Sequence, residues 1–251
     1  MEQYYVGSIE RKLYSVYYEP QPSANNEKAV ILCYPVGQEY IRCHRMYSNL
    51  AGKLVQEGVH VVKFDYSGTG DSHGEFSSAT LEQWISDIGR IAAELKAGTE
   101  ARQIYVVGVR LGAYLALKYA ETEAVDGMVL LSPVFDGADF LAEIRKDYRK
   151  WLNGSFARQR RSPKGQLECH GFLYSRTLTE QIKNITPTAI QFPQAPMLII
   201  DESISMIGDY SQVSYHPLVN KRLWKKNKGE DNKDVLPIHE INLICDWIAK
   251  I

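Results

Sequence analysis

Apolar runs bounded by turn residues alternate with stretches of helical periodicity along most of the chain. Short apolar runs predict buried strands, and apolar residues that recur every three to four positions predict helices with one buried face. We expect strands at 29–34, 59–64, 103–107, 125–131, 197–200 and 213–215, and helices at 45–56, 81–95, 111–120 and 241–251. Residues 4–18 alternate like two antiparallel leading strands. The pattern is typical of an α/β fold, a mostly parallel twisted sheet with helices on both faces.

The alternation stops between residues 136 and 190, where charged helical stretches and Gly, Ser and Pro breaks replace it. A long irregular segment within an α/β protein commonly covers a binding cleft. A chain of 251 residues with 45% apolar residues can bury one substantial core. We therefore expect a core formed by residues 1–135 and 191–251, with a helical lid inserted at 136–190.

Charge and cysteine usage narrow the class of partner. The net charge of −1 and the pI of about 6.6 give no global attraction to nucleic acid or to anionic lipid. The four cysteines are scattered without metal-ligand spacing, so we expect no metal, no cofactor and no disulfide framework. The expected partner is a small molecule or another protein, and we expect a monomer or homodimer.

The first residues lack the basic and apolar regions of a signal peptide. No apolar run approaches the roughly 20 residues of a membrane span. We therefore expect a cytoplasmic protein with no membrane span.

The run Gly108-Val109-Arg110-Leu111-Gly112 carries the most informative chemistry. It has the glycine frame of a nucleophile elbow, a sharp strand-to-helix turn whose central residue is strained and whose neighbours must be small. Arginine stands where the nucleophilic serine is expected. A guanidinium remains protonated and cannot act as a nucleophile. Serine-type hydrolysis from this position is therefore excluded.

Further motifs accompany the elbow. They are Pro35-Val36-Gly37-Gln38-Glu39 with His44-Arg45-Met46, the loop from Phe64 to Ser72, and His170-Gly171-Phe172-Leu173-Tyr174-Ser175. Over nearly the full chain, the set resembles α/β-hydrolases of the serine aminopeptidase-like group, and more narrowly the family called exosortase A system-associated hydrolase 2. The resemblance implies an α/β-hydrolase fold in which arginine at the elbow is a family trait. It does not imply hydrolysis, because "hydrolase" in that family name is inherited from the fold.

In the wider fold, the acid of a catalytic triad follows the strand that corresponds here to residues 197–200. Asp201 and Asp209 are therefore the candidate acids. The triad histidine precedes the last helix, where His239 lies too close to the helix and His216 lies in the last strand. The loop at 224–234 contains no histidine. We predict that no working Ser-His-Asp set exists, and we keep Asp209 and His216 as candidate site residues.

Arg110 needs a negative partner. At the N-terminus of a helix a cation is unfavourable by about 0.3 to 1 kcal/mol, because the helix dipole favours an anion there. One candidate partner is Glu39, as an ion pair that fills the old active site. The other is a carboxylate, phosphate or enolate of a ligand, held by Arg110 and the N–H groups of Leu111 and of Val36 or Gly37.

The lid adds weaker candidates. His170 and Tyr174 are of residue types that serve as acids or bases, and we include them as substrate-binding candidates. The basic cluster Arg158, Arg160, Arg161 and Lys164 could steer an anionic substrate or an acidic carrier protein, although a solvated lid face is the commoner role.

Three hypotheses follow. The first is a non-hydrolytic enzyme of the cyclase, isomerase, epimerase or lyase type, acting on an acyl, polyketide or peptide intermediate, free or bound to a carrier protein. In it Arg110 anchors an anion and Glu39 orients Arg110 or acts as base. The second is a non-catalytic binding protein in a biosynthetic or export pathway. The third, which we weigh least, is ester or peptide hydrolysis through Ser132 or Ser175.

Overall fold

The fold is organised around an eight-stranded sheet. The computed structural model describes residues 1–21, 27–155, 166–202, 210–220, 224 and 236–251. The strands follow the order β1-β2-β4-β3-β5-β6-β9-β10 across the sheet. Their bounds are β1 Glu2–Val6, β2 Leu13–Tyr18, β3 Lys28–Cys33, β4 His60–Phe64, β5 Gln103–Val109, β6 Gly127–Leu131, β9 Met197–Asp201 and β10 Val213–Pro217. From β4 to β10 all neighbours pair in parallel, whereas β2 pairs antiparallel with both β1 and β4.

Burial explains why these segments are strands. Every residue of β4 and β6 is buried, and so is nearly every residue of β3, β5 and β9. Such near-continuous runs of Val, Ile and Leu are typical of parallel strands covered on both faces. The predicted mostly parallel sheet and its two antiparallel leading strands are confirmed.

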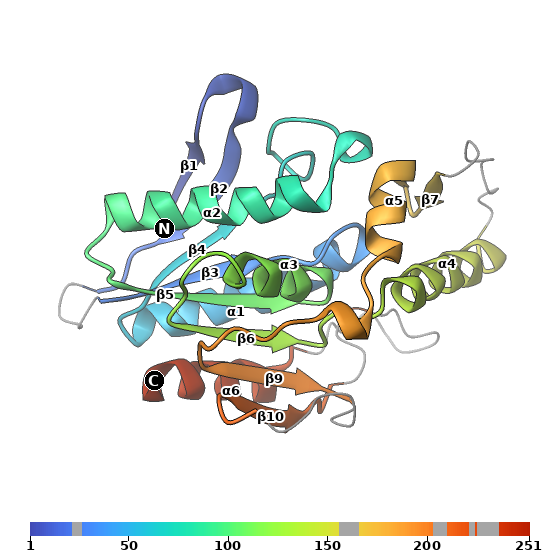
Figure 1. The fold of residues 1–251 in the computed structure, drawn as a ribbon. Coiled ribbons are helices and arrows are strands. Elements are labelled where there is room, and N and C mark those ends of the chain that lie inside the picture. The colour runs from blue at the N-terminus through green and yellow to red at the C-terminus, as the bar shows by residue number, and fades with distance from the viewer. Residues whose placement is uncertain (22–26, 156–165, 203–209, 221–223, 225–235) are drawn as a thin grey trace.

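Helices cover the two faces of the sheet (Figure 1). The helix α2 (Leu81–Gly98) packs with α3 (Leu111–Ala120) on one face, and α1 (Gln38–Gln56) packs with α6 (Ile238–Lys250) on the other. Short 3-10 turns occupy Ile9–Arg11, Phe76–Ser78 and Pro187–Ala189.

The segment at 136–190, which we call the insertion, lies at the carboxyl ends of the parallel strands (Figure 1). It contains the helices α4 (Gly137–Asn153) and α5 (Arg176–Lys183) and the hairpin of β7 (Leu167–Cys169) and β8 (Phe172–Tyr174). Sequence analysis did not predict this hairpin. At its turn His170 and Gly171 both have positive φ, of 54° and 88°.

Two helix starts were predicted too late. Helix α1 begins at Gln38, seven residues before the predicted start, because Gly37 turns the chain there with a φ of 63°. Helix α6 begins at Ile238, so that His239 lies exposed in its first turn.

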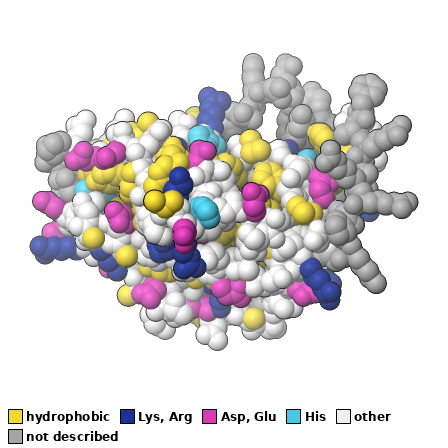
Figure 2. Space-filling view, turned by 90° about the horizontal axis from the view of Figure 1, so that it is seen from above, with side chains coloured by type: hydrophobic (Ala, Val, Ile, Leu, Met, Phe, Trp, Pro, Cys, Tyr) yellow, Lys and Arg dark blue, Asp and Glu magenta, His cyan; other side chains and the backbone are white. Residues whose placement is uncertain are grey.

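Acidic and basic side chains are interspersed on the face shown in Figure 2. That face therefore presents no single-sign field to a nucleic acid. Within the described ranges, no helix is long and apolar enough to cross a membrane.

Candidate functional site

The elbow has the predicted geometry. Strand β5 ends at Val109, helix α3 begins at Leu111, and Arg110 between them has a φ of 55° and a ψ of −121°. A Cβ on Gly112 would lie 2.2 Å from the Tyr34 carbonyl oxygen, and one on Gly108 would lie 2.5 Å from the Ala113 Cα. Backbone atoms cannot move aside cheaply, so glycine is required at both positions.

The Arg110 side chain is held by two carboxylates. Its Nε donates to Glu39 Oε1 at 3.0 Å, and its Nη2 pairs with Glu143 Oε2. Glu39 comes from the first turn of α1 and Glu143 from α4 of the insertion. Only 11% of the Arg110 side chain is exposed, against 9% for Glu39 and 27% for Glu143. We call the group formed by Glu39, Arg110 and Glu143 the charge triplet.

Electrostatics keep Arg110 charged. Burial alone lowers the pKa of Arg110, but the charges and hydrogen bonds of Glu39 and Glu143 outweigh this effect and raise the pKa. Two aromatic rings flank the guanidinium, with the ring centroid of Trp224 at 4.9 Å and that of Phe140 at 5.6 Å. Cation–π contacts of this kind favour a charged guanidinium over a neutral group.

Sequence analysis predicted one part of the triplet. The ion pair between Glu39 and Arg110 is present as expected. Glu143, Phe140 and Trp224 were missed as partners. The only indication of a second acid in the sequence was that a cation at a helix N-terminus needs a negative partner. That indication did not identify which acid of the insertion would reach the elbow.

The expected anion donors surround the same place. Leu111 is the first residue of α3, so its N–H is one of the groups that a helix leaves without an intrahelical acceptor. Val36 is buried beside Gly37, where a Cβ would lie 2.4 Å from the Tyr174 hydroxyl. Burial, and secondly the charge of Glu39, raises the pKa of Tyr174. The structure thus brings Gly37, Glu39 and Tyr174 together.

His170 lies elsewhere in the insertion. Its ring packs against both Tyr148 and Trp151, with centroid distances of 5.0 and 5.3 Å. Burial, and secondly the charge of Arg42, lowers the pKa of His170, so the ring is neutral at pH 7. Across the part of the chain that the structure describes, no hydrogen bond or ion pair joins His170 to Arg110.

The candidate triad residues that the structure describes, Asp201 and His216, form no hydrogen bond with Arg110. Asp209 lies outside the described residues, as do Arg158, Arg160, Arg161 and Lys164. His216 lies on the edge strand β10 with an exposed side chain, and no hydrogen bond among the residues described joins it to Arg110. Asp201 accepts from the Ser132 hydroxyl at 3.1 Å and from the Glu202 N–H at 2.7 Å.

In the wider fold the triad histidine comes from the segment before the last helix. Here the segment between β10 and α6 contributes Trp224 to the site instead. Its carbonyl oxygen accepts from Arg42 Nη1 at 3.0 Å while its ring covers Arg110. Among the described residues, no three His, Cys, Asp or Glu side chains gather closely enough to hold a metal ion.

The chain matches the model of a known protein family. The family model described as serine aminopeptidase, S33, matches residues 26–183. The chain belongs to this family. Its α/β-hydrolase fold agrees with the family assignment, and the matched residues include the elbow, the turn at Gly37 and the charge triplet. No curated protein matches the sequence of this S33 family member.

Solved structures match its fold over almost its whole length. The ferulic acid complex of Est1E from Butyrivibrio proteoclasticus is 16% identical, with a TM-score of 0.62 over 98% of this chain and 96% of that chain. The Pyrococcus furiosus esterase Pf2001 is 15% identical, with a TM-score of 0.65 over 99% and 90% of the two chains. Mouse alpha/beta hydrolase domain-containing protein 10 is 15% identical, with a TM-score of 0.56 over 100% and 99%.

Proposed function

We propose that this S33 family member is non-hydrolytic and binds an acyl, polyketide or peptide intermediate at Arg110, which holds either a carboxylate of the ligand or the enolate formed from its carbonyl. The observation that carries the proposal is the charged guanidinium at the elbow apex, held between Glu39 and Glu143. An arginine cannot form the acyl-enzyme on which serine hydrolases depend. It is, however, well suited to hold a carboxylate, a phosphate or an enolate.

The occupied donors of Arg110 determine how such a ligand enters. Two carboxylates already bind the guanidinium, so a ligand anion would reach it by replacing one of them. Glu143 is the more exposed of the two and belongs to the insertion, whereas Glu39 is buried on the core. A ligand carboxylate would therefore take the place of Glu143 and free α4 from the elbow. In this mechanism the insertion is a lid, and Glu143 occupies the ligand position when the site is empty.

The same arrangement supports proton-transfer chemistry. With the ligand carbonyl at Arg110 and the Leu111 N–H, the Glu39 carboxylate removes a proton from the carbon next to the carbonyl. The electron pair of that C–H bond moves into the carbonyl, and Arg110 stabilises the resulting enolate oxygen. Delivery of a solvent proton to the opposite face of that carbon, with loss of the Glu39 proton to water, completes an epimerisation, and return of the Glu39 proton to a different carbon of a conjugated enolate completes an isomerisation. Attack of the enolate carbon on a second carbonyl of the ligand would close a ring, and departure of a leaving group from the β-carbon would complete an elimination.

The second candidate function is a binding protein without turnover. It is favoured by the burial of the guanidinium between two aromatic rings and two carboxylates, which stabilises the empty state. Hydrolysis through another serine has less support. Ser132 is buried and donates to Asp201, and the Ser175 hydroxyl caps α5 by accepting from the Leu178 N–H at 3.1 Å.

Proton exchange in D2O tests the enzymatic proposal. The probe is butyryl-N-acetylcysteamine, a thioester that mimics a carrier-bound acyl group, and NMR follows deuterium entry next to its carbonyl. We expect the wild-type chain to accelerate exchange and Arg110→Gln to reduce the enzymatic rate by about a hundredfold. Glu39→Gln should be equally slow, whereas Glu180→Gln on the exposed face of α5 should match wild type.

The alternatives give different results. Saturable binding of the thioester without exchange would favour the binding protein over the enzyme. Ester hydrolysis with fluorophosphonate labelling at Ser132 or Ser175 would contradict the non-hydrolytic assignment.

A further inference from the structure

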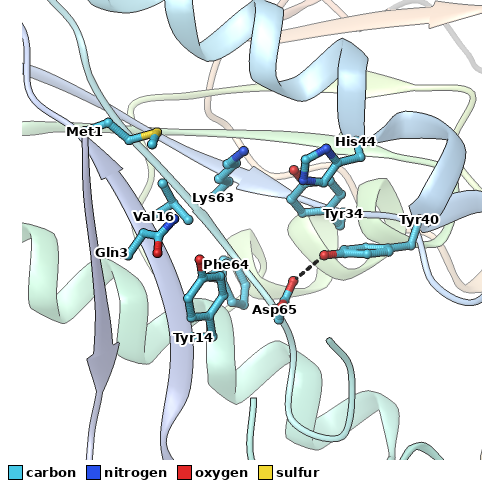
Figure 3. A pocket seen from close by; sticks show the side chains of 10 residues that line it. All are labelled: Met1, Gln3, Tyr14, Val16, Tyr34, Tyr40, His44, Lys63, Phe64 and Asp65. Atoms are coloured by element: carbon cyan, nitrogen blue, oxygen red, sulfur yellow. Dashed lines mark hydrogen bonds between the residues drawn. The ribbon is translucent and has the colours of Figure 1, made fainter. Parts of the chain in front are cut away.

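A pocket lies beside α1, where the helix meets the strands at the β1 edge of the sheet (Figure 3). Its volume is about 170 Å³. The side chains that matter for its chemistry are Tyr34, Tyr40, His44, Lys63, Phe64 and Asp65. None of the residues that line it belongs to the charge triplet, so an inference about it does not depend on the function proposed for Arg110.

Lys63 gives the pocket a buried positive charge. It lies on β4, is only 8% exposed, and donates from Nζ to Ser48 Oγ at 3.0 Å. Its ammonium also lies 5.4 Å from the ring centroid of Tyr18. Within the described ranges, Lys63 forms no ion pair with a carboxylate. Since an ammonium carries three donors, it can still bind an acceptor in the pocket.

Tyr34 adds an unused donor. The residue is 2% exposed, and its hydroxyl has no hydrogen-bond partner in the part of the chain that the structure describes. A buried hydroxyl without a partner costs stability, and an acceptor placed in the pocket would remove that cost. Figure 3 shows the Tyr34 hydroxyl and the Lys63 amine directed toward the same part of the pocket, beside His44.

Asp65 is the acidic side chain of the pocket, and both of its oxygens already accept hydrogen bonds. Its Oδ1 accepts from the Tyr40 hydroxyl at 2.8 Å and its Oδ2 from the Asp71 N–H at 3.0 Å (Figure 3). Burial raises the pKa of Asp65. Burial, and secondly the charge of Lys63, lowers the pKa of His44, which favours the neutral ring with one N–H donor. The ammonium of Lys63, the N–H of His44 and the unpartnered hydroxyl described above remain as donors for a ligand.

The aromatic side chains that line the pocket fit a ligand with a planar apolar ring. The Tyr34 ring lies 4.9 Å from that of Tyr40 and 6.3 Å from that of His44, and Phe64 and Tyr14 line the opposite side. A cavity of about 150 Å³ holds one benzene molecule, so the volume here fits a single ring with a small substituent.

We propose that this pocket is a binding site for a small organic carboxylate with a planar apolar body. The carboxylate accepts from Lys63 Nζ and the Tyr34 hydroxyl, and the ring lies between Tyr40 and Phe64.

Benzoate is the probe for this site. Calorimetry on the full chain should show saturable binding of benzoate, at least about tenfold tighter than that of benzyl alcohol, because hydrogen bonds to charged groups are the stronger kind. Acetate, which lacks the ring, and benzylamine, which carries the opposite charge, should also bind more weakly. Amide NMR shifts should move at residues 40–44 and 63–65.

Variants locate the site. Lys63→Met should weaken benzoate binding by about tenfold or more, and Tyr34→Phe by about threefold, since the phenylalanine removes only a neutral donor. Arg110→Gln should leave the affinity for benzoate unchanged, because the elbow is a separate site. If Lys63→Met does not fold, Tyr34→Phe and the shift map of the wild-type chain decide the question.

Several results would overturn the proposal. They are an absence of saturation in the millimolar range, tighter binding of benzylamine than of benzoate, full affinity in a folded Lys63→Met variant, and loss of benzoate binding in Arg110→Gln.

Discussion

At the residue scale, the elbow has a strained backbone with an arginine at its apex. Arg110 has a positive φ, which costs free energy for any residue with a Cβ. Because Gly108 and Gly112 pack closely against backbone atoms, the turn cannot follow another path here. The strained turn therefore places the Arg110 side chain where its guanidinium meets the two carboxylates.

Removing one member of the buried ion pair should lower the free energy of unfolding more than removing both members. Arg110→Met leaves Glu39 buried without its main counter-charge and should lower the free energy of unfolding by about 3 kcal/mol. Adding Glu39→Gln to that variant should recover much of the loss, because no buried charge then lies unpaired. Urea denaturation of the two single variants and the double variant measures the coupling. Strictly additive effects would show that the pair is not a coupled unit.

The second glycine of the elbow gives another prediction at this scale. In Gly112→Ala the new methyl group would lie 2.2 Å from the Tyr34 carbonyl oxygen and 2.3 Å from that of Cys33. We expect a loss of about 3 kcal/mol or more, since neither strand backbone can retreat. Gly98→Ala at the end of α2 is the matched control, because a Cβ there meets nothing within 4 Å. Equal thermal stability of the two variants would contradict the close approach.

At the element scale, the strands were predictable and the hairpin within the insertion was not. Buried parallel strands such as β3 and β6 are unbroken apolar runs, and the observed bounds lie within two residues of the predicted ones. The hairpin of β7 and β8 has only three residues in each strand, too few for an alternating pattern to emerge. The start of α1 is set by the turn at Gly37, which has a φ of 63° and which helical periodicity does not encode.

The turn of that hairpin gives a prediction about backbone conformation alone. Gly171 has a φ of 88°, and a Cβ there meets nothing within 4 Å. Gly171→Ala should therefore destabilise the protein by about 1 to 2 kcal/mol through strain. Gly52 lies inside α1 and is equally open, so Gly52→Ala should instead stabilise it by about 0.5 to 1 kcal/mol. Thermal unfolding should shift in opposite directions, and a shared direction would contradict the positive φ at Gly171.

At the scale of the whole molecule, the charge triplet joins the insertion to the core. Glu39 and Arg110 belong to the core, whereas Glu143 and Phe140 belong to α4. Sequence analysis predicted that Arg110 needs an anion and that Glu39 supplies one. It could not predict Glu143, because α4 also carries Asp139 and Asp147 and only the docked helix selects among the three acids. For the same reason the ring of Trp224 could not be assigned to the elbow.

This junction should control how α4 opens. Glu143→Gln removes a partly exposed ion pair worth about 1 kcal/mol, so the amides of α4 should exchange with deuterium about fivefold faster. Amides of β5 and β6 should exchange as in the wild-type chain, because their burial does not depend on α4. Glu180→Gln is the matched control, since its pair with Arg176 lies exposed within α5 alone and joins no two parts of the molecule. Faster exchange throughout the core would indicate global destabilisation instead, and unchanged exchange in α4 would show that Glu143 does not hold the insertion closed. A local increase confined to α4 is the behaviour required of a helix that a ligand carboxylate can displace from Arg110.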